Sequence, residues 1–189
     1  METDLHLACF FGYGSLVNRA THSYPGAIPA RLAGWRRVWV HTAARPVAFL
    51  SVEPAPEITI DGLLAEVPGA DWSALDLREA AYLRHPVQVD CAGQGRAAQV
   101  YAVPQDAAVP PETRHPVLLS YLDAVVQGFL REWGPDGVER FFATTAGWDA
   151  PFLDDRAAPR YPRAQDLSRR ETALADAGLA RMGARVIRA

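Results

Sequence analysis

The chain has 189 residues, of which 49% are hydrophobic, and a formal net charge of -3. This length and apolar content suffice for one domain with a buried core. The acidic balance argues against nucleic acid as the main partner, because phosphate binding requires an electropositive face. No apolar run approaches the ~20 residues of a membrane span, and no basic region precedes the short apolar run at the N-terminus. We therefore expect a cytoplasmic protein with neither a membrane nor a nucleic-acid partner.

All 19 basic residues are arginine, and the chain contains no lysine. This excludes Schiff-base chemistry on a lysine and the lysine of a nucleotide-binding P-loop. The two cysteines, Cys9 and Cys91, are interpreted as buried free thiols rather than as a disulfide. No motif indicates a metal or a cofactor, and no pattern indicates an oligomeric state.

Predicted strands dominate the first half of the chain, and predicted helices follow. Alternating or valine-rich runs bounded by proline and glycine predict strands at Leu7–Gly12, Arg31–His41, Val47–Val52, Glu57–Val67, Val87–Cys91 and Gln99–Val103. Helical periodicity predicts helices at Asp71–Arg84, Pro116–Trp133 and Leu167–Met182. This order indicates an α+β fold. We expect a single domain over residues 1–189, in which 165–189 can be an appended C-terminal helix.

Two arginine-containing stretches outside these helices have ordinary structural interpretations. "WRRVWVH" mixes arginine with aromatic residues, and we interpret it as a strand with alternate residues exposed. "GWDAPFLDDRAAPRYPRAQ", residues 147–165, is expected to be a loop. Its arginine-rich part can be a substrate lid, a subunit contact or a plain surface loop, and we favour the surface loop.

The stretch "FFGYGSLVN", residues 10–18, places two glycines around one residue directly after an apolar run. A dinucleotide-binding fingerprint needs a third glycine, but Val17 stands there, and no acidic residue follows before Glu53. A serine nucleophile at Ser15 would need an adjacent base, and the sequence places none there; Ser15 can instead cap a short helix. The remaining interpretation is an anion cradle made of backbone N–H groups, with Gly12 and Gly14 allowing close approach.

A glutamate lies on the apolar face of the predicted helix 71–84. Glu79 follows Leu75 by four positions and precedes Tyr82 by three, in the middle of the stripe, whereas Arg78 points away from it. A carboxylate seldom occupies such a place without a cause. Two causes fit: a buried ion pair with Arg31, Arg36 or Arg156, or a general base whose pKa is raised by desolvation.

Together these residues resemble the gamma-glutamylcyclotransferase-like superfamily. The resemblance covers roughly residues 7 to 130 and is carried by "FGYGSL" and by "LDLREAAYLRHPVQV", with support from "GLLAEVP", "QVYAVP" and "HPVLLSYLDAVVQGF". It implies a small mixed β-barrel packed by helices. It also implies that Tyr13, Gly14, Ser15 and Leu16 form the site loop and that Glu79 is the catalytic acid. Residues 134–189 match no motif of the family.

The resemblance implies further site residues and a reaction. Tyr101 and Tyr121 would bind substrate through their hydroxyls, although each can equally be a core tyrosine, and Tyr82 is a further candidate. The reaction releases 5-oxoproline from a small γ-glutamyl amide, such as glutathione or a γ-glutamyl peptide, without cofactor or metal. One alternative is a cyclotransferase acting on γ-glutamylamines of another pathway. Another is a non-catalytic binder on the same fold.

Overall fold

The computed structural model describes residues 8–110 and 113–188, and a five-stranded barrel forms one half of it. Strands β1 (Cys9–Gly12), β2 (Ile28–Val40), β3 (Phe49–Glu66), β4 (Leu83–Cys91) and β5 (Gln94–Ala102) are hydrogen-bonded in the order β3-β1-β5-β4-β2. An additional pairing of β2 with β3 closes the barrel. The β1–β5 pair is parallel and the other barrel pairs are antiparallel. The prediction of an α+β fold with a small mixed β-barrel is confirmed.

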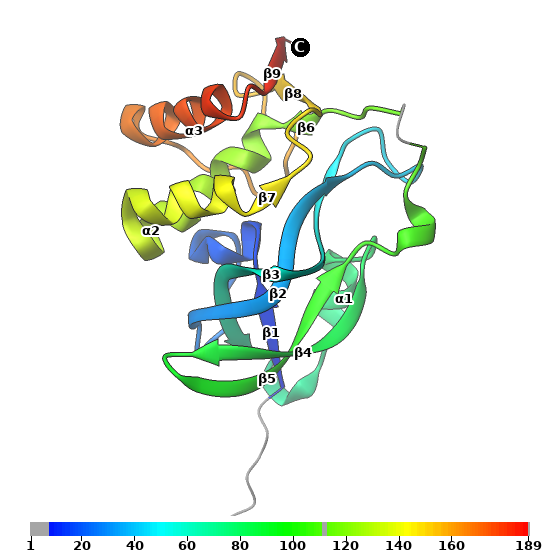
Figure 1. The fold of residues 1–189 in the computed structure, drawn as a ribbon, viewed down its shortest axis with the longest axis vertical. Helices are drawn as coiled ribbons and strands as arrows, with labels where there is room; N and C mark the ends of the chain where they lie inside the picture. The colour runs from blue at the N-terminus through cyan, green and yellow to red at the C-terminus, as the bar shows by residue number, and fades with distance from the viewer. Residues whose placement is uncertain (1–7, 111–112, 189) are drawn as a thin grey trace, which may run out of the picture.

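A helical layer covers one end of the barrel (Figure 1). Helices α2 (Leu119–Ala143) and α3 (Arg169–Arg181) pack together and share a core that includes Phe142, Ala175 and Leu179. Strand β7 (Thr145–Ala146) pairs with β2, and a separate parallel sheet contains β6 (Val117–Leu118), β8 (Pro151–Asp154) and β9 (Arg185–Arg188). In the described part of the chain, no helix is long and apolar enough to cross a membrane.

Short elements connect these layers. Two 3₁₀ turns, η1 (Ser15–Val17) and η2 (Arg19–Thr21), follow β1, while η3 (Pro68–Ala70), α1 (Ser73–Arg78) and η4 (Gln105–Ala107) connect later strands.

The prediction of separate strands at Val47–Val52 and Glu57–Val67 is wrong, because both belong to β3. Residues 55–58 lie where the β2–β3 register shifts, so the interrupted ladder accommodates Pro56.

The predicted helix Asp71–Arg84 is wrong in its second half. Helix α1 has six residues and ends where the Glu79 N–H donates to the Leu75 carbonyl, and Glu79 itself leaves the helical conformation (φ -100°, ψ 33°). From Leu83 onward the chain pairs with β5 along the whole of β4. This strand pairing overrides the local helical periodicity, and Leu83 is 57% exposed instead of buried.

The two later helices agree better with the sequence, and the loop between them does not. The predicted helix end at Trp133 coincides with a break inside α2, where Gly134 adopts a positive φ of 67° ahead of Pro135. Helix α3 begins with a capping box made by Ser168 and Glu171. The expected loop 147–165 contains strand β8, which a run of four residues is too short to reveal.

The buried residue Arg37 connects the barrel, the loop after β1 and helix α2. Its side chain is 0% exposed. Its Nε donates to the Tyr13 carbonyl at 2.7 Å, its Nη1 donates to Thr144 Oγ1 at 2.9 Å, and its Nη2 donates to the Asp61 carbonyl. The guanidinium also lies over the ring of Phe129, 4.8 Å from the ring centre. Burial lowers the pKa of Arg37 to about 9, so the group stays charged at neutral pH.

An irregularity in the pairing of β2 with β3 precedes the inward turn of Arg37. Before this irregularity the buried positions are Ala30 and Leu32, whereas after it they are Arg37 and Trp39. The shift lies between Ala33 and Trp35, next to Gly34 with a φ of 80°. The face of β2 that is buried changes across this irregularity, so the arginine enters the interior.

We expect Arg37→Met to lower the free energy of unfolding by about 3 kcal/mol or more, because it leaves buried oxygen acceptors without a donor. Urea denaturation of the purified variant measures this loss. The matched control is Arg36→Met on the same strand, which removes only a surface ion pair with Glu53 and should cost about 1 kcal/mol or less. Equal losses in the two variants would contradict the central role of Arg37.

Candidate active site

The loop of Tyr13, Gly14, Ser15 and Leu16 is fixed on both sides by buried contacts. The Tyr13 carbonyl accepts from Arg37, and the Tyr13 hydroxyl donates to the Tyr101 carbonyl at 2.6 Å. At Gly14, a Cβ would stand 2.8 Å from the Tyr121 hydroxyl oxygen, so this close approach requires glycine. The N–H of Val17 then donates to the Gly14 carbonyl at 3.0 Å and turns the chain away.

Glu79 lies directly after α1, and its side chain is only 16% exposed. Burial raises the pKa of its carboxyl, and the charges of Arg78 and Arg163 lower it without reversing the net upward shift. A carboxyl tuned in this direction can accept and return a proton nearer to neutral pH than an ordinary glutamate.

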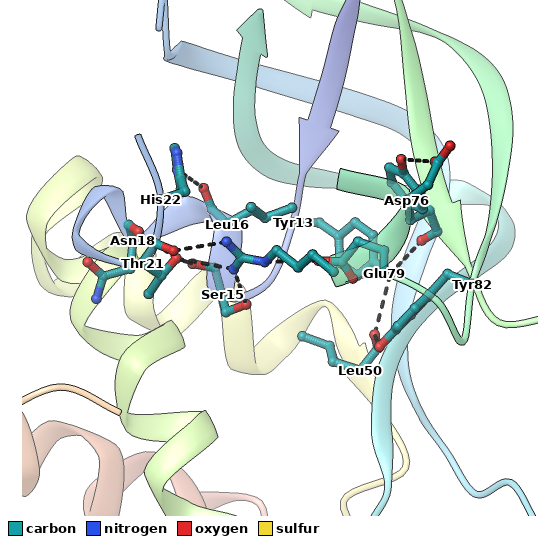
Figure 2. A network of polar contacts seen from close by, with 12 residues as sticks. Tyr13, Ser15, Leu16, Asn18, Thr21, His22, Leu50, Asp76, Glu79 and Tyr82 are labelled. Atoms are coloured by element: carbon teal, nitrogen blue, oxygen red, sulfur yellow. Dashed lines mark hydrogen bonds and ion pairs between the residues drawn. The ribbon is translucent and has the colours of Figure 1, made fainter. Parts of the chain in front are cut away.

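Arg78 is the ionic partner of Glu79, and its predicted orientation away from that face is wrong. Its side chain is 8% exposed and its Nε lies 3.2 Å from Glu79 Oε1. Its Nη1 donates to the Thr21 carbonyl at 2.9 Å, and its Nη2 lies 3.3 Å from the Ser15 hydroxyl. Arg78 is the last residue of α1 and follows the buried Leu75 by three positions, so both lie near one face of the helix. In Figure 2, Ser15, Leu16 and Thr21 lie on one side of this network and Glu79, Asp76 and Tyr82 lie on the other.

The three arginines considered for a buried ion pair with Glu79 are engaged elsewhere. Arg31 pairs with Asp61, Arg36 with Glu53 and Arg156 with Asp123. The ion-pair partner of Glu79 is Arg78, its neighbour in the sequence, and both residues line the cavity described next.

Two connected hollows meet at Glu79. The outer cavity has a volume of about 360 Å³, at the lower end of the range for small-molecule sites. The inner pocket has about 30 Å³, enough for one polar group, and the whole Tyr13–Leu16 loop lines it. Five residues line both hollows: Ser15, Leu50, Glu79, Tyr82 and Tyr121. The loop and the acid therefore face the same space, although they are more than 60 positions apart in the sequence.

The tyrosines near the site have different hydrogen-bond partners. The Tyr101 hydroxyl donates to Asp76 Oδ1 at 2.6 Å, so this side chain lines the inner pocket with its hydroxyl already bonded. The Tyr82 hydroxyl donates to the Leu50 carbonyl at 3.0 Å. Tyr121 lines both hollows, and burial raises the pKa of its hydroxyl, which keeps it neutral and able to donate.

Sequence reasoning missed Arg78, Tyr161 and Arg163, all of which line the outer cavity. Tyr161 and Arg163 belong to the segment that the sequence analysis interpreted as a surface loop. Their composition carried no signal, because only the packing of that segment against α2 brings them to the cavity. Among the described residues, no group of three or more His, Cys, Asp or Glu is arranged to hold a metal ion.

Comparison with known proteins gives one family and a common fold. The sequence model of the family described as "Gamma-glutamyl cyclotransferase, AIG2-like" matches residues 10–121, which is more than half of the chain. No curated protein matches. A solved structure described as "Gamma-glutamyl cyclotransferase" has a TM-score of 0.58 at 16% identity and covers 90% of this chain and 98% of that one.

Two further solved structures share the fold. A human protein described as uncharacterized, loc79017, gives a TM-score of 0.59 at 16% identity, with 90% of this chain and 99% of that one covered. YkqA from Bacillus subtilis gives 0.57 at 19% identity, with 75% of this chain and 56% of that one covered. At these identities the likeness shows the fold.

The buried position of Glu79 predicts a pH-dependent contribution to stability. Between the ordinary pKa of a glutamate and its raised value in the fold, the folded protein holds a proton that the unfolded chain has lost. The free energy of unfolding therefore falls as pH rises through this window, by about 1.4 kcal/mol for each unit by which the pKa is raised.

Glu79→Gln cannot titrate there, so the stability of the native chain minus that of this variant should decrease from pH 4 upward and then level off. Urea denaturation across pH measures the difference, with the exposed Glu57→Gln as control. A difference that increases with pH would show that Arg78 outweighs burial and lowers the pKa of Glu79.

Proposed function

We propose, for a chain that belongs to the gamma-glutamyl cyclotransferase, AIG2-like family, that it releases 5-oxoproline from a small γ-glutamyl amide. The observation that carries this proposal is the shared cavity: Glu79 and the Tyr13–Leu16 loop line the same inner pocket. A base for the amine and donors for an oxygen are the two groups that an intramolecular aminolysis requires.

The reaction needs one proton carrier and no covalent enzyme intermediate. Glu79 accepts a proton from the α-ammonium of the substrate, and the freed amine nitrogen attacks the γ-carbonyl carbon. A C–N bond forms and closes the five-membered ring, and the ring nitrogen releases a second proton to solvent to become the lactam N–H. Glu79 then gives the proton to the departing nitrogen as the original amide C–N bond breaks, so that the products are 5-oxoproline and a free amine. One buried carboxyl with a raised pKa suits both transfers.

Backbone N–H groups of the Tyr13–Leu16 loop are assigned to the negative oxygens of the substrate. The inner pocket admits one polar group beside the loop, which fits the oxygen of the γ-carbonyl as it gains charge. Donors fixed before the reaction are effective because they do not have to reorganise when the charge develops. The contacts of Tyr13 with Arg37 and with the Tyr101 carbonyl supply that fixation.

Arg78 orients the base. Its guanidinium lies between the Glu79 carboxylate and the oxygens of Ser15 and Thr21, so it holds the acid and the loop at one separation. It does not neutralise the function of the acid, because the pKa of Glu79 stays above its ordinary value despite this contact. The Tyr121 hydroxyl, beside Gly14, is assigned to a remaining polar atom of the substrate.

Glu79→Gln should keep the fold and lose turnover by about 10²- to 10⁴-fold, the usual contribution of a general acid–base. The assay incubates the protein with glutathione and with γ-glutamyl dipeptides and quantifies 5-oxoproline by mass spectrometry. In the native chain, kcat/KM should fall as pH drops through the raised pKa of Glu79, because the protonated acid cannot accept a proton.

The exposed Glu57→Gln serves as the control and should leave turnover unchanged. A Glu79→Gln chain that folds and keeps more than about a tenth of the native rate would remove Glu79 from the general-base role.

A further inference from the structure

The outer cavity has a wall that comes from residues beyond the family match. Residues 160–163 line it, and they follow β8 in the chain. Asp155 fixes this wall onto the start of α2: its carboxylate accepts from the Ser120 N–H at 2.8 Å, from the Ser120 hydroxyl at 2.6 Å and from the Arg160 N–H at 2.9 Å. Asp155 is 2% exposed. The wall is therefore a built part of the cavity.

The cavity carries a surplus of positive charge in a protein whose net charge is negative. Four arginines line it, Arg45, Arg78, Arg160 and Arg163, against Glu79 as the single lining carboxylate among the described residues. Arg78 is already paired with Glu79. Arg45, Arg160 and Arg163 form no side-chain ion pair with any residue that the structure describes, so three guanidinium groups are available to an anion entering the cavity, two of them in this wall.

A buried tyrosine hydroxyl in the same wall also lacks a partner. The Tyr161 hydroxyl oxygen is inaccessible to solvent and makes no hydrogen bond within residues 8–110 and 113–188. Its ring packs edge-on against Tyr121, with ring centres 5.1 Å apart. Buried hydroxyls in folded proteins nearly always have a partner, so this one is an unsatisfied polar group within the wall of the cavity.

The position of Glu79 indicates which end of a substrate lies in the inner pocket and which end lies in the outer cavity. The acid lines both hollows and has to contact the bond that breaks, so that bond lies at their junction. The loop and the inner pocket lie on one side of the junction, and the wall with Arg160 and Arg163 lies on the other. The departing amine therefore points toward the arginines.

We propose that Arg160 and Arg163 bind a carboxylate on the leaving side of the substrate, which makes this chain selective for γ-glutamyl amino acids or peptides over uncharged γ-glutamylamines. This inference rests on the proposed cyclisation. Paired guanidinium donors match the planar oxygens of a carboxylate, and such charge-assisted bonds are stronger than neutral ones.

The experiment compares γ-glutamyl-alanine with γ-glutamyl-alaninamide, which differ only in a terminal carboxylate or carboxamide. The native chain should prefer the carboxylate by about tenfold or more in kcat/KM, as expected for a charge-assisted hydrogen bond. In Arg160→Gln/Arg163→Gln the preference should disappear, measured as the ratio of kcat/KM for the two compounds, because loss of the Arg163 charge also changes the pKa of Glu79 and so the turnover of both. Arg163→Lys, which keeps the charge, should retain part of the preference. Arg170→Gln, an exposed arginine of α3, is the control and should behave as the native chain.

Equal turnover of both compounds by the native chain would overturn the inference. An equal loss on both compounds in the double variant would also overturn it, because the arginines would then serve the glutamyl end. Binding to the Glu79→Gln chain, measured by calorimetry, separates the two proposals. If neither compound is turned over but the carboxylate binds at least tenfold more tightly, the selectivity stands and the cyclisation fails. Equal binding, or none, refutes the selectivity.

Discussion

The guanidinium of Arg37 holds together the three parts of the molecule on which the site depends. It donates to the carbonyl of Tyr13 in the loop, to the carbonyl of Asp61 in β3 and to Thr144 at the end of α2, and it lies over Phe129. A buried charge is costly unless every donor finds an acceptor. Any displacement of the loop would leave that charge uncompensated, so the loop is held where it faces Glu79.

Burial also acts on a second ionisable group of the site, the carboxyl of Glu79, which is less completely buried than Arg37. Glu79 is mostly buried, and among the residues that the structure describes only the Arg78 guanidinium forms an ion pair with it, so burial dominates its pKa. Arg78 in turn divides its donors between the acid and the loop. The result is a carboxyl with a fixed position that is not locked in its ionised form, which is the state that a carrier of one proton requires.

Strand alternation and proline and glycine punctuation are local signals, and they predicted most of the strands and the two later helices. The barrel was implied by the resemblance that two short motifs carry. The structure places the loop and Glu79 on one pocket, and their roles stay a prediction. The sequence could not place Arg37 or Arg78. Arg37 lies in "WRRVWVH", and its burial follows from the irregular pairing of β2 with β3 after Ala33, which the sequence does not reveal. Arg78 follows the buried Leu75 by three positions on α1, so it shares the buried face of that helix instead of pointing away from it. Tyr161 and Arg163 reach the cavity only through the Asp155–Ser120 contacts, which join residues 35 positions apart.

A crystal structure of the Glu79→Gln chain with an intact γ-glutamyl dipeptide tests the central claim most directly. The account predicts the γ-carbonyl oxygen in the inner pocket beside the backbone of Tyr13–Leu16, with the α-amine within hydrogen-bond distance of the substituted side chain at position 79. A dipeptide bound with its γ-carbonyl away from the loop, or with its α-amine out of reach of position 79, would contradict it.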